Sequence, residues 1–264
     1  MEVKQLNETT YEIVCRTAHY KIVNQKIREL VNKNASKIIL REVFGQRYIG
    51  TGIKEPIKIE IHGIAGNDLG IFLYNPKIEV FGNSQDCVGN TMMKGEIIVR
   101  GHAGDVCGYG MRGGKVYIEG DVGYRVGIHM KGYKEFVPTL IIGGKAGNFF
   151  GEYMAGGKLI LLGLNRKTGE DIVGDYCATG MHGGIIYVRG EVPEKYLGKE
   201  VKIFEIDEKE KNLLKEELKG FANRFGLSVE EIMSKPFTKI VPVSARPYGR
   251  LYAHRWGIAS GVIK

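Results

Sequence analysis

Residues 101–120 of the chain read GHAGDVCGYGMRGGKVYIEG, and this stretch contains the pattern that decides the fold. After the opening glycine, Gly108 follows seven residues later and Met111 follows ten residues later. A Gly-Gly pair then precedes a short run of alternating apolar residues that ends at Gly120, where the same pattern starts again. The repeating unit is therefore 19 residues long.

The unit recurs on both sides of this stretch. With the glycine at the end of each apolar run as the anchor, successive anchors are 19, 19, 19, 24, 19 and 27 residues apart. The two longer intervals hold insertions at 134–138 and 164–171, after which the pattern resumes in register. The anchors are Gly63, Gly82, Gly101, Gly120, Gly144, Gly163 and Gly190. The inner glycines are Gly70, Gly89, Gly108, Gly127 and Gly151, and the large apolar slot holds Leu73, Met92, Met111, Met130, Met154 and Met181.

A period of 19 residues is shorter than the repeats of helical solenoids, and it fits one coil of short strands joined by sharp turns. Glycine at such turns adopts positive φ angles or allows close approach of neighbouring coils. Methionine in one repeated slot predicts a stacked column in the core. We therefore predict an all-β core, a right-handed parallel β-helix with α-helical or irregular caps at both ends. Its predicted structural residues are Gly82, Gly89, Gly101, Gly108, Gly120, Gly127, Gly144, Gly151, Gly163, Met111, Met154 and Met181.

The chain divides into three predicted parts. Residues 1–53 form an N-terminal cap with one helix, whose apolar face lies within Tyr20–Asn34. Residues 54–192 form six to seven coils of the β-helix. Residues 193–264 form a C-terminal helical cap and a basic tail, in which we expect the stretch from Phe237 to Lys264 to be extended and irregular.

The C-terminal cap contains two helix-start signals. Asp207 and Glu210 begin a helix that Gly226 ends, and Ser228 with Glu231 begins a shorter one. Leu214, Leu218, Phe221 and Phe225 form the apolar stripe of the longer helix.

Composition narrows the class of protein. The 38 glycines are accompanied by only 7 prolines, which excludes a collagen-like or Pro/Gly-rich linker sequence. Four scattered cysteines do not predict a disulfide framework. The N-terminus lacks the apolar segment of a signal peptide, and no apolar run is long enough for a membrane span. We therefore expect a cytoplasmic protein without membrane contacts.

The net charge of +8 is concentrated near the C-terminus, where the last 30 residues contain six basic and no acidic side chains. A basic tail is typical of nucleic-acid binding or of docking on an acidic partner. The tail also contains aromatic residues, which indicates that it packs against something. We predict a partner interface rather than a nucleic-acid site, formed by Arg246, Arg250, Arg255 and Trp256.

Catalytic and cofactor-binding patterns are missing from the coils. Residues 108–113 match G-x-G-x-x-G, but the dinucleotide fingerprint also requires a βαβ unit, and here the match lies in a repeated turn. Cys107 and Cys177 occupy a slot that is otherwise apolar, so we expect them to be core residues. The histidines form no repeated column. We therefore predict no catalytic, cofactor-binding or metal-binding residues in this chain.

The repeat position four residues after each anchor glycine is mostly polar, so these side chains are expected to stack as a ladder. Stacked carboxylates here are compatible with Ca²⁺, but a single slot supplies few ligands, so turn chemistry is the favoured interpretation. The ladder consists of Asn67, Asp86, Asp105, Tyr124, Asn148 and Asp175.

The outward position of each strand run is largely apolar. Enzymes that act on carbohydrates along a β-helix groove need clustered outward carboxylates, which this column lacks. An exposed apolar stripe is instead typical of an interaction surface, so we predict a partner-binding face. The column consists of Glu79, Ile98, Tyr117, Ile141, Ile160 and Tyr187.

Several of these stretches resemble the GXGXG domain, the β-helix at the C-terminus of the glutamate synthase large subunit. Residues 147–163 (GNFFGEYMAGGKLILLG) are similar to its "EYMTGG" coil, and residues 175–188 (DYCATGMHGGIIYV) to its "AGMTGGIAYV" coil. Residues 65–70 (AGNDLG) resemble its early "AGQSFG" coil, and residues 237–243 (FTKIVPV) resemble the "F-x-K-V-x-P" stretch that follows its helix.

The resemblance implies a role in a multi-chain glutamate synthase. In that family a glutamine amidotransferase domain releases ammonia, and a domain with FMN and an Fe–S cluster makes glutamate from 2-oxoglutarate. The β-helix carries no catalytic residues. As a stand-alone chain it is then expected to be a scaffold subunit, whose partners hold FMN, the Fe–S cluster and the NADPH or ferredoxin site. The coils are also similar to the β-helical scaffold of formylmethanofuran dehydrogenase, which lies beside molybdenum or tungsten subunits and remains the alternative.

Overall fold

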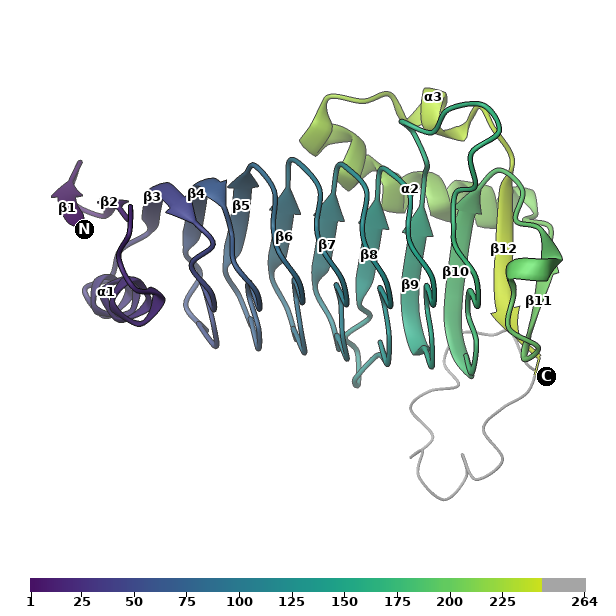
Figure 1. Ribbon diagram of the computed structural model, residues 1–264, viewed down its shortest axis with the longest axis horizontal. Helices are drawn as coiled ribbons and strands as arrows, with labels where there is room; N and C mark the ends of the chain where they lie inside the picture. Colours follow the sequence, from purple (N-terminus) through teal and green to yellow (C-terminus); the bar gives the residue numbers. More distant parts are fainter. Residues whose placement is uncertain (244–264) are drawn as a thin grey trace, which may run out of the picture.

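The computed structural model describes residues 1–243, and these form one continuous twelve-stranded sheet wound into a solenoid (Figure 1). The strand order is β1-β2-β3-β4-β5-β6-β7-β8-β9-β10-β12-β11, and neighbours from β2 to β10 pair in parallel. The prediction of a parallel β-helix is confirmed. The coil strands are β3 (Lys37–Phe44), β4 (Lys58–Ile64), β5 (Lys77–Phe81), β6 (Glu96–Val99), β7 (Lys115–Ile118), β8 (Thr139–Ile142), β9 (Ala155–Leu161) and β10 (Gly183–Arg189).

Strand register follows the sequence repeat. Ile78 pairs with Ile97, Ile97 with Val116, and Val116 with Leu140, so equivalent slots stack directly. Each pair is fully buried and faces the interior of the solenoid. The methionines of the large apolar slot, Met111, Met154 and Met181 among them, are buried in the same core. Their thioether side chains fill the irregular space behind each turn.

The repeated glycines serve two different purposes. At Gly127 the backbone has φ +76°, and a Cβ atom would lie 2.7 Å from Leu159 of a neighbouring coil. Gly82, Gly89, Gly108, Gly151 and Gly163 also have positive φ angles. Positive φ is absent at Gly101, Gly120 and Gly144, which instead lie against side chains of the preceding coil. Glycine is favoured in the first group by its positive φ angle, with close approach added at Gly127, and in the second group by close coil-to-coil approach alone.

The stacking begins before residue 54, earlier than the repeat indicates. Within the N-terminal segment, β2 (Thr10–Val14) pairs in parallel with β3, and β1 (Glu2–Gln5) pairs antiparallel with β2. Between β2 and β3 the chain forms α1 (Tyr20–Asn32), whose apolar face is buried at the end of the core. The 19-residue period is not visible here, because α1 makes the segment from β2 to β3 longer than one coil.

At the other end, two helices form where their capping residues predict them. In α2 (Glu208–Phe225) the Asp207 side chain accepts a hydrogen bond from the Glu210 N–H at 2.7 Å, and Gly226 ends the helix at φ +66°. In α3 (Val229–Met233) Ser228 Oγ accepts from the Glu231 N–H at 3.2 Å. These caps satisfy N–H groups that the first turn leaves free.

The expectation of an irregular stretch from Phe237 is wrong for its first residues. The segment Phe237–Pro242 forms β12, which lies antiparallel between β10 and β11 (Val201–Phe204). A short 3₁₀ helix, η1 (Glu194–Tyr196), precedes β11. Because β10 would otherwise end the parallel sheet with unpaired backbone groups, β12 satisfies that edge. None of the helices within residues 1–243 has the length and apolar composition needed to cross a membrane.

Candidate interaction surfaces

The outward apolar column of the strands is covered by the chain itself. Ile98, Ile141 and Ile160 are fully buried, and they form a second hydrophobic cluster with Leu214, Leu218 and Phe221 of α2. The Tyr117 ring meets Phe221 edge-on with ring centroids 6.1 Å apart. The prediction that this column is a partner-binding face is therefore wrong. Its partner is α2, which lies along the strands of the C-terminal half (Figure 1).

Where α2 ends, the same face of the sheet changes from apolar to charged. Lys58 bonds Glu60 at 2.6 Å, and Arg100 bonds Glu79 at 2.7 Å. Burial acts to raise the pKa of Glu60, but its bonds to Lys58 and Lys37 outweigh burial and hold the pKa below its ordinary value. These carboxylates are paired with cations and are not free for general acid–base catalysis. On this half of the face, Glu60 and Glu79 are therefore held in ion pairs with neighbouring cations.

The polar ladder at the turns links one coil to the next. Asp86 Oδ1 accepts a hydrogen bond from the Asp105 N–H at 2.9 Å, and Asp105 Oδ1 accepts from the Tyr124 N–H at 2.8 Å. Asn148 does the same for Asp175 at 3.1 Å. The favoured interpretation, backbone hydrogen bonding at turns, is confirmed, although the bonds run between coils and not within one turn. The side-chain oxygens stabilise backbone N–H groups that the turns leave without a carbonyl partner.

A second ladder of this kind lies one residue past the anchors and was missed in the sequence. The Asn83 side chain accepts from the His102 N–H at 2.9 Å, and His102 Nδ1 accepts from the Asp121 N–H at 2.9 Å. Asp121 Oδ1 then accepts from the Lys145 N–H at 2.8 Å. The signal was present, because all three side chains offer an acceptor at a fixed place in the repeat.

Replacing Asp105 by alanine should therefore cost about 1–3 kcal/mol of folding free energy, because the Tyr124 N–H loses its acceptor. Asp105→Asn keeps an oxygen at the same place and should change stability much less. Urea unfolding of both variants measures this difference. A Ca²⁺ site would give the opposite signature, a thermal midpoint that rises with added Ca²⁺ and falls with chelator in the wild type.

Reactive thiols and clustered metal ligands are absent from the described part of the chain. Burial raises the thiol pKa of Cys107 and of Cys177 to about 12, so neither forms a thiolate at neutral pH. Cys15 and Cys87 have thiol pKa values raised to about 11, also mainly by burial. Within residues 1–243, no three His, Cys, Asp or Glu side chains lie close enough together to hold a metal ion.

The buried thiols predict a loss of stability in alkali. Folding favours the neutral thiol, so the stabilisation is complete below the ordinary pKa of 9.0 and is lost as the pH rises toward 12. In that window, each of the two buried thiols should lower the free energy of unfolding by about 1.4 kcal/mol per pH unit. Urea midpoints at several pH values above 9 measure this slope. The double variant Cys107→Ala/Cys177→Ala should show a shallower slope, and an equal slope would contradict the assignment.

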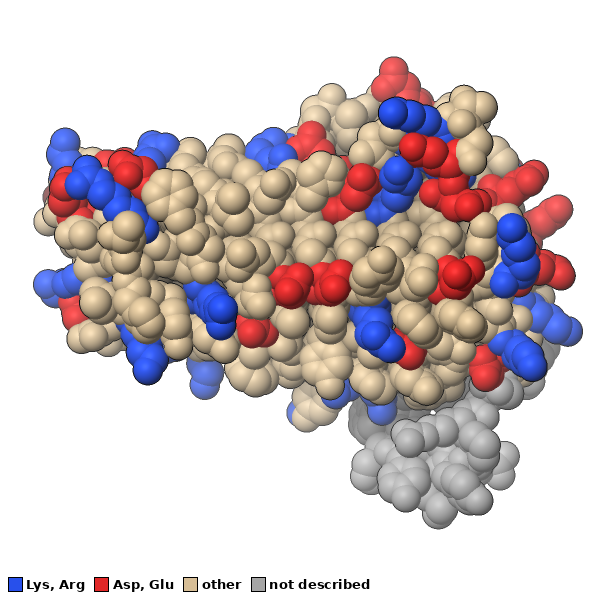
Figure 2. Space-filling model, viewed as in Figure 1, with Lys and Arg blue, Asp and Glu red and all other residues tan. Residues whose placement is uncertain are grey.

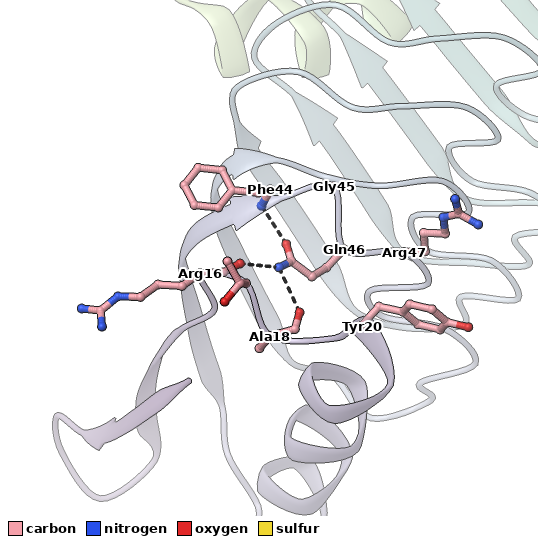
Figure 3. A pocket seen from close by; sticks show the side chains of 8 residues that line it. Arg16, Ala18, Tyr20, Phe44, Gly45, Gln46 and Arg47 are labelled. Atoms are coloured by element: carbon pink, nitrogen blue, oxygen red, sulfur yellow. Dashed lines mark hydrogen bonds between the residues drawn. The ribbon is translucent and has the colours of Figure 1, made fainter.

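One shallow hollow lies between the start of α1 and the end of β3 (Figure 3). It holds about 280 Å³ and is lined by Ala18, Phe44 and Gln46, with Arg16 and Arg47 at its rim. The Gln46 amide donates to the carbonyls of Arg16 and Ala18 at 2.8 and 3.2 Å, and its oxygen accepts from the Phe44 N–H at 2.7 Å. The two arginine side chains point away in opposite directions. The amide is used entirely to join backbone segments, so this is a structural joint.

Comparison with known proteins agrees with this picture of repeated coils. The model of the GXGXG motif family matches residues 4–243, which is nearly the whole chain. The chain belongs to the GXGXG family. It is also 45% identical over 249 residues to the uncharacterized protein MJ1350 of Methanocaldococcus jannaschii, a match that covers 91% of this chain and 95% of that protein.

Membership in the GXGXG family confirms the resemblance to the C-terminal domain of the glutamate synthase large subunit. It indicates a glutamate synthase-related role. The predicted interface residues Arg246, Arg250, Arg255 and Trp256 lie outside the described residues, so their place on the solenoid stays a prediction. On the face shown in Figure 2, charged side chains are densest at the two ends of the molecule, and the middle carries a small group of acidic side chains among uncharged residues.

Proposed function

We propose that the chain is the non-catalytic scaffold subunit of a split glutamate synthase. Its partners are a glutamine amidotransferase subunit, which releases ammonia, and a synthase subunit with FMN and an Fe–S cluster, which makes glutamate from 2-oxoglutarate. Electrons come from NADPH or ferredoxin through the partner subunits. The proposal assigns no cofactor to this chain.

The observation that carries the proposal is the GXGXG match over residues 4–243. The M. jannaschii relative is matched over 95% of its length, so that protein too consists almost entirely of this domain. The described residues are compatible with a scaffold role, since Cys107 and Cys177 are buried in the core and the carboxylates of Glu60 and Glu79 on the sheet face are ion-paired. A solenoid of stacked, hydrogen-bonded coils offers long faces on which other chains can be positioned.

Purification of the tagged chain from its native organism, followed by mass spectrometry and a visible spectrum, tests the proposal. We expect an amidotransferase chain and flavin and Fe–S absorbance in the purified complex. A molybdopterin-bearing partner would contradict the proposal and indicate a formylmethanofuran dehydrogenase scaffold. Recovery of the chain alone and colourless would contradict both.

A further inference from the structure

A row of basic side chains follows one corner of the solenoid, where each coil turns into its strand. We call it the basic corner, and it consists of Lys94, Arg112, Lys131 and Lys134. The Arg112 N–H bonds the Met92 carbonyl at 2.8 Å, and the Lys131 N–H bonds the Met111 carbonyl at 3.0 Å, so Arg112 and Lys131 occupy the same slot of successive coils. Lys94 lies one residue past that slot in the preceding coil, and Lys134 lies in the insertion before β8. Successive coils are about 4.8 Å apart, which brings like charges close together.

The basic corner differs from the sheet face in that its described cations are not ion-paired, although the exposed Glu135 follows Lys134 in the hairpin. Within residues 1–243, no carboxylate lies within 4 Å of any of its four cationic groups, whereas Lys58, Lys77 and Arg100 on the sheet face are each ion-paired. Arg112 and Lys131 are like charges in the same slot of neighbouring coils, so they repel each other. An anionic surface placed against them would remove this repulsion.

Aromatic rings flank the basic corner. The residues inserted before β8 form a small hairpin, in which Tyr133 and Phe136 exchange backbone hydrogen bonds of 3.0 Å. Phe136 lies against Gly113, next to Arg112, and Lys134 lies over the exposed Tyr133 ring at 5.5 Å. In Figure 1 this hairpin projects from the lower edge of the solenoid between β7 and β8.

A neighbouring aromatic column distinguishes between two kinds of anionic partner. His129 stacks on Tyr153 with centroids 5.4 Å apart, and Tyr109 meets His129 edge-on at 5.9 Å. The stack covers one face of His129 and one face of Tyr153, which leaves less ring surface for nucleic-acid bases. Tyr109 and Tyr153 are nevertheless exposed, and tyrosine with arginine is the combination enriched at protein interfaces. The column therefore favours a protein partner.

We propose that the basic corner and its hairpin dock an acidic surface of a partner protein chain. The inference rests on the proposed function, which supplies the partner chains. Tyr133 and the hairpin would contribute apolar contact area at one end of the basic corner, and the four cations would orient the partner and accelerate its association.

The test uses the full chain and the amidotransferase-type and FMN/Fe–S-type chains encoded in the same genome, with binding measured by titration. The variant Lys94→Glu/Lys131→Glu reverses two exposed charges of the basic corner. The variant Lys209→Glu/Lys215→Glu makes the same charge change at exposed positions on α2. Circular dichroism and thermal midpoints verify that both variants fold.

We expect the first variant to weaken binding of one partner chain by about tenfold or more, and the control by less than about twofold. Wild-type affinity should fall as salt rises, and that dependence should shrink in the first variant. Equal binding by both variants would overturn the inference and leave the proposed function standing. Failure of the wild type to bind either chain would overturn both. Binding of a single-stranded RNA oligonucleotide that the first variant abolishes would overturn the inference in favour of nucleic acid.

Discussion

Gly63→Ala should unfold the N-terminal coils of the solenoid. Gly63 has φ +129°, a region that other residues avoid, and a methyl group there would overlap the Val43 carbonyl oxygen of the preceding coil. Val43 is itself fully buried and pairs with Gly63 across β3 and β4, so its backbone cannot retreat without disturbing the sheet. We expect a loss of more than about 4 kcal/mol of folding free energy, because strain and backbone overlap add together.

Gly52→Ala is the matched control. Gly52 also has a positive φ angle, +63°, but nothing lies within 4 Å of the position that its Cβ atom would take. Its cost should be about 1–2 kcal/mol, from conformation alone. Denaturant unfolding of the two variants separates overlap from conformation, and equal losses would show that coil-to-coil approach is not what requires glycine at Gly63.

Leu214→Asp should detach α2 from the sheet. Leu214 is 2% exposed and packs in the cluster that covers the outward apolar column, whereas its neighbour Leu213 is 59% exposed. An unpaired carboxylate is not tolerated in an apolar cluster, so the helix leaves the sheet rather than bury it. Leu214→Asp should lower the free energy of unfolding by more than about 3 kcal/mol. Leu213→Asp should have a free energy of unfolding within about 0.5 kcal/mol of the wild type.

Release of α2 should also be detectable as newly exposed apolar surface, in addition to the loss of stability. It uncovers Ile98, Tyr117 and Ile141, which together would present a large exposed apolar face. Leu214→Asp should therefore bind a hydrophobic dye, self-associate and be cut within α2 by protease, all of which are absent in Leu213→Asp. A Leu214→Asp variant that stays monomeric and resists protease would contradict the covering role of α2.

The coils of the solenoid were predictable because each imposes the same local requirement. The turn that needs a positive φ angle at Gly89 needs it again at Gly108 and Gly127. The repeated geometry therefore appears in the sequence as glycines at a fixed spacing. The first coil was not predictable in this way. There α1 separates β2 from β3, and a repeat interrupted by a 13-residue helix has no visible period.

The covering of the sheet face shows a different limit. The apolar stripe of α2 and the apolar column of the strands were each evident in the sequence, and each was understood as a separate surface. Nothing in their spacing states that Phe221 meets Tyr117, because the two lie far apart in the sequence and only the path of the chain brings them together. An unpartnered apolar face in a sequence is best compared first with the other unpartnered faces of the same chain.

The sequence predicted the chemical roles of individual residues better than it predicted where an interaction surface lies. The slots of Cys107 and Asp105 in the repeat indicated a buried thiol and a turn acceptor, and the structure bears out both. The basic corner was not predicted, because in the sequence Arg112 and Lys131 look like ordinary surface cations. Only the fold shows that no described carboxylate lies within 4 Å of them. Missing counter-charges are a property of three-dimensional neighbours and not of composition.

Glutamate synthesis by the reconstituted complex tests the central claim most directly. The amidotransferase-type and FMN/Fe–S-type chains are assayed with glutamine and 2-oxoglutarate, with and without this chain. We predict that the chain alone makes no glutamate and shows no flavin absorbance, and that adding it raises glutamine-dependent synthesis by the other two by about tenfold or more, the scale expected when reactive sites are held in position. Equal synthesis in its absence, or activity in the isolated chain, would contradict the account of a non-catalytic scaffold.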